Sequence, residues 1–178
     1  SEVILVRSTQ RTSPVTYVRT ITTDGNLLIF RSNVKSSNSM RSLEISELVS
    51  VVTLSRLMKI AADKGNTTAM NKYGLMLKNG SGVAADKKLA CHYLKMAADN
   101  GQTGAMFNYA SMLKKGQGVA ANNEEAAKYF KMSADNGLSV GMFKYGCMLL
   151  GGDGVSVDKE EAARYFKMAA DQGDTDSM

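Results

Sequence analysis

The chain repeats itself every 36 residues, and this period limits the folds open to it more than any single residue does. The motif Ala97-Ala98-Asp99-Asn100-Gly101 has counterparts at residues 61–65, 133–137 and 169–173. Gly80-Ser81-Gly82-Val83 has counterparts at 116–119 and 152–155. A fixed period of this length is typical of a stacked array of supersecondary units. Such arrays usually bind other proteins along an extended surface. The pattern therefore predicts a kind of function without identifying a partner.

Each period is predicted to form a helix, a glycine loop and a second helix, in three full units over 66–101, 102–137 and 138–173. Apolar residues of the first unit recur at helical spacing. They are Met70, Tyr73, Met76 and Leu77 in the first helix, and Ala90, Tyr93, Leu94, Ala97 and Ala98 in the second. We expect Gly101 to end the second helix in the left-handed conformation. Ala90, Ala126 and Ala162 are expected where the two helices of a pair approach closely.

The helix starts are marked by capping residues. Asn122 with Glu125, and Asp158 with Glu161, have the spacing of capping boxes at second helices. Thr67, Thr103 and Ser139 are hydroxyl residues where the first helices begin, so we expect them to act as N-caps.

Partial repeats flank the three units. Val49–Gly65 aligns with a second helix, and Asp174–Met178 with the start of a fourth unit. We expect Ala162, Tyr165, Phe166 and Ala169 of helix 158–171 to face the place of that fourth unit. An uncovered apolar face predicts a longer array or self-association through the open C-terminal repeat.

Residues 1–48 lack the repeat, whereas 49–178 form the repeat domain. Up to Arg56 the chain has six arginines and one lysine, and from Leu57 onward fourteen lysines and one arginine. Val15–Thr22 and Asn26–Arg31 flank Asp24-Gly25, which is typical of a β-hairpin. A disordered lead-in, the tail of another domain and a misjoined translation are the alternatives.

The spacing Ala69-Met70-x-x-Tyr73-Gly74, followed by Gly80-x-Gly82-Val83 and by Ala90-x-x-Tyr93, occurs three times in register. With these motifs the chain resembles the Sel1-like repeat family, a relative of the tetratricopeptide repeats, over about 49–178. The resemblance implies an all-α, right-handed α-solenoid of paired antiparallel helices. It also implies a non-enzymatic adaptor or scaffold. Ala110 and Gly141 depart from the pattern. Some secreted bacterial members carry a cysteine pair in each unit, which this chain lacks.

Charge and cysteine content narrow the function further. The net charge is +5, but residues 61–178 contribute only +1, so nucleic acid is not an expected partner. No apolar run is long enough to span a membrane. Cys91 and Cys147 occupy different slots, so we expect two free, buried thiols and a reducing compartment. The expected location is the cytoplasm, with an ER-associated protein as the alternative.

No residue pattern indicates catalysis, a metal or a cofactor. The Gly-x-Gly loops lack a following Lys-Ser pair, and His92 is the sole histidine. The pairs Glu124-Glu125 and Glu160-Glu161 fall in first helical turns, where negative charge is favourable. Methionines recur in three slots and are expected to pack between units. The third slot is Met96, Met132 and Met168.

The candidate partner-binding residues are slots that vary between units while their neighbours do not. In the related tetratricopeptide arrangement the first helices line the concave face. Transferred through Tyr73 and Gly74, that face includes Asn71, Leu75, Lys78, Phe107, Ser111, Lys114, Phe143, Cys147 and Leu150. We expect a protein, as a peptide or helix, to bind there on Phe107 and Phe143. The alternatives are that both phenylalanines are buried between units, and that the chain is a regulatory segment of a larger enzyme such as a kinase.

Overall fold

The computed structural model describes residues 15–21, 27–33 and 38–175, and the chain divides into two compact units, Ser1–Glu47 and Leu48–Met178. In the first unit, β1 (Val15–Ile21) pairs antiparallel with β2 (Leu27–Asn33), with Val18 opposite Phe30. The Asp24-Gly25 turn lies outside the described residues. The long helix α1 (Asn38–Asp63) begins well before the expected Val49, and its residues from Leu48 onward belong to the second unit.

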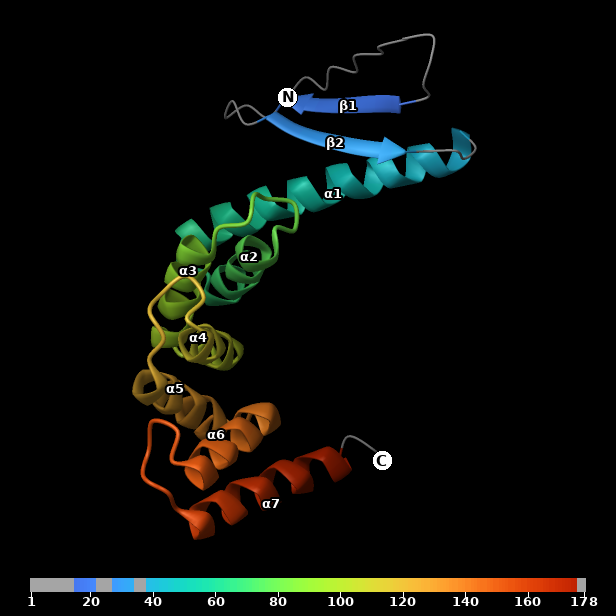
Figure 1. The fold of residues 1–178 in the computed structure, drawn as a ribbon. Helices are drawn as coiled ribbons and strands as arrows, with labels where there is room; N and C mark the ends of the chain where they lie inside the picture. The colour runs from blue at the N-terminus through green and yellow to red at the C-terminus, as the bar shows by residue number, and fades with distance from the viewer. Residues whose placement is uncertain (1–14, 22–26, 34–37, 176–178) are drawn as a thin grey trace. The chain divides into compact units, whose positions relative to one another are not determined.

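The second unit is a helical solenoid. Its further helices are α2 (Thr67–Asn79), α3 (Lys87–Asp99), α4 (Thr103–Lys115), α5 (Asn123–Asp135), α6 (Ser139–Gly151) and α7 (Lys159–Thr175). From α2 on, each helix packs against the next one along the chain (Figure 1). The six helices form three hairpins with loops at Gly80, Gly116 and Gly152, which confirms the predicted architecture.

The helix starts are only partly as predicted. The second helices are capped by side-chain oxygens of Asp86, Asn122 and Asp158, each accepting a hydrogen bond from the backbone N–H three residues on. The expected caps of the first helices are wrong by one residue. Asn66 and Gln102 cap α2 and α4 with their side chains, and Leu138 precedes α6 without a side-chain cap. Thr67, Thr103 and Ser139 are the first helical residues instead.

The two glycines of each loop have different tasks. Gly80, Gly116 and Gly152 end the first helices with φ between 61° and 73°, a left-handed conformation that glycine adopts at little cost. The second glycine packs on the preceding second helix. A Cβ on Gly82 would lie 2.5 Å from the Val51 carbonyl oxygen, and one on Gly118 would overlap Lys87. The loop is therefore both a chain reversal and a contact between units.

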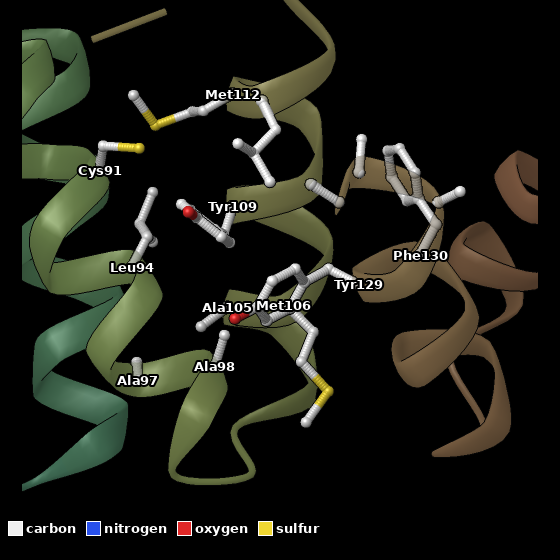
Figure 2. Close-up of a cluster of buried hydrophobic side chains, with 14 of the residues drawn as sticks. Cys91, Leu94, Ala97, Ala98, Ala105, Met106, Tyr109, Met112, Tyr129 and Phe130 are labelled. Atoms are coloured by element: carbon white, nitrogen blue, oxygen red, sulfur yellow. The ribbon is translucent and has the colours of Figure 1, made fainter. Parts of the chain in front are cut away.

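Small residues let the two helices of a pair approach closely. Ala90, Ala126 and Ala162 are fully buried, as predicted. A Cβ on Gly74 would lie 2.8 Å from Leu94 of the facing helix. Each pair also has two tyrosines packed edge to face, with ring centroids 5.0 Å apart for Tyr73 and Tyr93. Figure 2 shows the buried side chains of α3, α4 and α5 that surround Tyr109.

Ser133 and Gly141 are two departures from the repeat pattern that compensate each other. Ser133 replaces the alanine found at Ala97, and its hydroxyl donates to the Phe130 carbonyl at 2.8 Å. Gly141 replaces the alanine found at Ala105, and a Cβ there would overlap the Ser133 hydroxyl. The oxygen added on α5 thus occupies the space of the methyl group missing from α6.

A hydrogen-bonded joint links each second helix to the next. Tyr129 of α5 donates to Asp99 of α3 at 2.5 Å, and Lys95 of α3 lies 2.8 Å from the other oxygen of Asp99. The same joint connects Tyr93 with Asp63 and Lys59, and Tyr165 with Asp135 and Lys131. We call this arrangement the tyrosine joint. Since each tyrosine ring packs within its own unit, the joint ties the interior of one unit to the end of the preceding one.

Two packing predictions are wrong. Met132 and Met168 are 40% and 46% exposed, so these two members of the third methionine slot do not pack between units. Met96 of that slot is partly buried against the core, and Met70, Met106, Met112 and Met148 are buried. Ala162 and Tyr165 are buried because they face α6, where the Tyr165 ring meets Tyr145. They do not face the place of a fourth unit.

Candidate partner-binding surface

The predicted partner-binding residues lie on the three first helices of the hairpins. Asn71, Leu75 and Lys78 of α2 are partly buried. Asn71 accepts a hydrogen bond from Asn108 of α4 at 3.0 Å, so the faces of α2 and α4 adjoin here. Phe107 and Ser111 of α4 are also partly buried. The Phe107 ring meets Phe130 at 5.5 Å between centroids, and the Ser111 hydroxyl donates to the Phe107 carbonyl.

The face becomes exposed and apolar on α6. Val140, Phe143 and Leu150 are 51%, 51% and 48% exposed, and Cys147 is exposed between them. Their spacing of three, four and three residues places them in one row along the helix, which spans about 15 Å at 1.5 Å per residue. We call these four residues the α6 row. Phe143 touches the Phe166 ring at 5.5 Å between centroids while half of its surface stays open.

The charge of this face is one-sided. The three first helices contain Lys72, Lys78, Lys114, Lys115 and Lys144, and they contain neither aspartate nor glutamate. The near-neutral total over the repeats hides this asymmetry, which sequence reasoning missed. A count of charges for each helix would have found it. Lys144 lies over the Phe143 ring, 5.9 Å from its centroid. Lys114 pairs with Asp153 of the following loop at 2.5 Å, so one loop carboxylate partly neutralises the row of lysines.

The cysteines are both free, as predicted, but they differ in exposure. Cys91 is buried, and burial raises the pKa of its thiol. Cys147 is exposed within the α6 row, so the expectation of a small buried side chain is wrong for this residue. Burial of Cys91 fits a structural role, because a raised pKa leaves less thiolate for chemistry.

The other polar candidates have structural partners. Glu125 accepts a hydrogen bond from the Tyr109 hydroxyl at 3.2 Å. Burial, and after it the charge and hydrogen bond of Glu125, raise the pKa of Tyr109. Gly118 and Gly154 pack against the first turns of α3 and α5, which leaves no open phosphate cradle at these loops. Within the described residues, no group of three or more histidine, cysteine, aspartate or glutamate side chains is arranged to hold a metal ion.

A second group of exposed apolar side chains is found on α1. Val51, Leu54, Leu57 and Ile60 are 36%, 47%, 55% and 52% exposed. In the repeat register Leu54 and Leu57 occupy the slots of Ala90 and Tyr93, which in a full unit pack against a first helix. Sequence reasoning treated this segment only as an aligned half-repeat and did not identify these exposed side chains.

The sequence model of the Sel1 repeat matches the chain three times, over residues 67–102, 103–138 and 139–174. The chain belongs to the Sel1 repeat family. Sel1 repeat proteins are generally helical scaffolds for protein interactions and are typically non-catalytic. No curated protein matches the chain. Among the described residues, no helix has the length and apolar character needed to cross a membrane.

Solved Sel1 repeat structures share the fold. The chain is 34% identical to c5321, a protective antigen of uropathogenic Escherichia coli, at a TM-score of 0.64, covering 65% of this chain and 25% of that one. It is 27% identical to a Sel1 repeat protein from Oxalobacter formigenes, at a TM-score of 0.65, covering 74% and 56%. Helicobacter pylori cysteine rich protein B is 20% identical, at a TM-score of 0.55, covering 67% and 90%. The chain thus spans a quarter and about half of the first two.

Proposed function

We propose that this Sel1 repeat chain is an adaptor that binds a protein partner along α2, α4 and α6. The partner contributes a short amphipathic segment, and its apolar side chains lie on the α6 row. The single observation that carries the proposal is that row. Three large apolar side chains are each about half exposed on one face of a single helix, although the core beneath them is closely packed. An exposed apolar row at this density is typical of an interaction site.

The lysines define the chemistry of the partner. Five lysines and no carboxylate on the first helices favour a segment with acidic residues beside its apolar ones. Phe143 is the expected anchor because it is the exposed aromatic residue of the row, and Phe107 is a secondary one because it is partly buried. Lys114 is expected to contribute little, since Asp153 already pairs with it.

The test is selection of binding peptides from a displayed random library, followed by affinity measurements. Phe143→Ala combined with Phe107→Ala should weaken binding at least about 30-fold, because anchor residues often contribute about 2 kcal/mol or more. Lys144→Gln should mainly reduce the salt dependence of binding, and Lys114→Ala should change it less. The matched control is Met132→Ala, an exposed apolar residue on α5, outside this face.

Helix content measured by circular dichroism separates binding from folding. If the double variant unfolds, the two phenylalanines are part of the core and the alternative role is correct. If it folds and binds the selected peptides as before, the assignment to the α6 row is wrong.

The free thiols Cys91 and Cys147 favour a reducing compartment, and we propose the cytoplasm.

A further inference from the structure

Two asparagine side chains bond to each other across the first helices of neighbouring hairpins. Asn108 of α4 donates an amide N–H to the side-chain oxygen of Asn71 of α2 at 3.0 Å, and both residues are partly buried. We call these two residues the amide pair. An asparagine side chain has two N–H donors and one oxygen that can accept twice. The bond therefore leaves the Asn71 amide nitrogen and the Asn108 oxygen as a neighbouring donor and acceptor.

The amide pair lies in line with the expected anchors of the partner. Asn71 occupies the slot of Phe107 and Phe143, and Asn108 occupies a slot in which the other two first helices carry a lysine. At this one junction the face thus offers neither an apolar surface nor a charge. It offers hydrogen bonds to a group that can both donate and accept.

A glycine leaves open space beside the amide pair. Gly104 lies in the first turn of α4 without a positive φ, where glycine is less favourable than alanine. A Cβ there would lie 3.4 Å from the Asn71 amide nitrogen and from the Gln102 amide, which is ordinary contact, so the fold itself would accept alanine. Thr68 and Val140, its counterparts, both have a Cβ. The missing side chain leaves room for another backbone to approach the pair closely.

We propose that the amide pair and Gly104 form a subsite for the main chain of the bound segment. A peptide carbonyl of the partner accepts from the Asn71 amide, and a peptide N–H donates to the Asn108 oxygen. Peptide groups inside a helix already bond to one another, so the segment is extended where it crosses α2 and α4. This inference rests on the proposed function and narrows its partner from a peptide or helix to an extended peptide.

The test is an ester scan of one acidic amphipathic peptide selected on the parent chain. Each copy has one peptide bond replaced by an ester, which removes that N–H and weakens the carbonyl as an acceptor. One ester position should weaken binding about 5-fold, the typical effect of one hydrogen bond. With Asn108→Ala the unmodified peptide should bind about 5-fold more weakly, and that same ester should then have no further effect. The other ester positions should act equally on parent and variant.

Gly104→Ala repeats the test without removing either asparagine. It should leave the Tm of the free chain unchanged or raise it, and weaken binding about 5-fold because the methyl group keeps the main chain away from the pair. The ester that matters in the parent should matter less in this variant. Gly173→Ala is the matched control, since Gly173 lies in α7 and a Cβ there would meet nothing within 4 Å. It should leave binding unchanged. If Asn108→Ala does not fold, the ester comparison with Gly104→Ala decides.

Three results would refute the main-chain subsite. The first is an ester scan that is the same for the parent, Asn108→Ala and Gly104→Ala. The second is a selected peptide that binds as a helix. The third is binding that depends on an asparagine or glutamine side chain of the peptide and on no ester position. If such peptides still lose binding with Phe143→Ala, the proposed function stands without this subsite. Binding that Phe143→Ala does not affect refutes the proposed function, whatever the ester scan shows.

Discussion

At the scale of single residues, the solenoid accommodates sequence changes in matched pairs. Ser133 and Gly141 together replace the two alanines of the standard junction, and each change makes sense only with the other. The serine hydroxyl is buried and bonded to the Phe130 carbonyl, so it cannot turn away from α6 without losing that hydrogen bond. The space that it takes is the space that glycine leaves.

This pairing predicts strong non-additivity. Gly141→Ala should destabilise the fold by about 1–3 kcal/mol, because a methyl group would be forced onto a buried hydroxyl in a closely packed region. Ser133→Ala should cost less, and the double variant should be close to the parent or more stable, since it restores the junction of Ala97 and Ala105. Urea denaturation of the four proteins gives the coupling free energy. Additive effects of the two substitutions would contradict the assignment.

Local sequence patterns were reliable for residues whose role depends on their own helix. The spacing of Met70, Tyr73 and Leu77 predicted the buried side of α2 correctly, and Asn122 and Asp158 were identified as caps. Met132 and Met168 were misjudged because recurrence in a repeat does not distinguish packing between units from exposure to solvent. The hydroxyl residues Thr67 and Thr103 were misassigned because Asn66 and Gln102, one residue earlier, have side-chain oxygens that accept from backbone N–H groups of the first turn.

At the scale of elements, the glycine loops set the contact between one hairpin and the next. The second glycine of each loop has a positive φ, and a Cβ on it would overlap the preceding second helix. The overlap is with the first turn of α3 for Gly118 and of α5 for Gly154, and with Val51 inside α1 for Gly82. Sequence reasoning recognised the loop as a chain reversal. It could not detect the second task, because the atoms that exclude a side chain at Gly118 belong to Lys87, thirty-one residues earlier in the chain.

Substitutions by alanine separate strain from crowding. Gly101→Ala should cost about 1–2 kcal/mol, because φ is 86° there and a Cβ would meet nothing within 4 Å. Gly118→Ala has a similar φ of 80° but also a steric overlap with backbone atoms of α3. Gly118→Ala should therefore lower the free energy of unfolding by at least about 1 kcal/mol more than Gly101→Ala does. Chemical denaturation measures the difference, and equal costs would show that the loop can move away from α3 freely.

At the scale of the whole repeat array, the tyrosine joints make stability depend on pH. Burial and the hydrogen bond to Asp63 raise the pKa of Tyr93 from its ordinary value of 10.0 to about 12. Burial also raises the pKa of Tyr129 and Tyr165, with the hydrogen bonds to Asp99 and Asp135 as the next cause. Partial burial by itself would raise the pKa of Asp99, but hydrogen bonds from Lys95 and Tyr129 outweigh it, and the pKa is lowered.

A tyrosine whose pKa is higher in the folded than in the unfolded chain stabilises the fold at every pH below its unfolded pKa. This stabilisation is lost as the pH rises through the folded pKa. The Tm of the chain should therefore fall between about pH 10 and pH 12. Tyr93→Phe should lower the Tm at pH 7, where the lost hydrogen bond costs about 1 kcal/mol. The Tm of the same variant should fall less steeply than that of the parent as the pH rises from about 10 to about 12. Thermal scans in matched buffers measure both slopes, and parallel curves for parent and variant would be the contrary result.

The repeat period, the family resemblance and the boundaries of the hairpin helices could be predicted from sequence because they depend on local spacing, whereas the early start of α1 could not. The exposure of the α6 row could not be predicted from sequence, because Val140 and Leu150 are apolar and would fit a buried position equally well. Only the packing of Phe166 and its neighbours beneath the row distinguishes the two cases.

Each tyrosine of a joint belongs to one unit by its ring and to the preceding unit by its hydroxyl. A hairpin therefore cannot open alone, because its opening removes a hydrogen-bond donor from its neighbour and uncovers the next tyrosine pair. Local fluctuations that expose backbone amides should involve several units at once. Hydrogen exchange would then report capture of a partner on the first helices as slower exchange in α3 and α5 as well, which carry the joints.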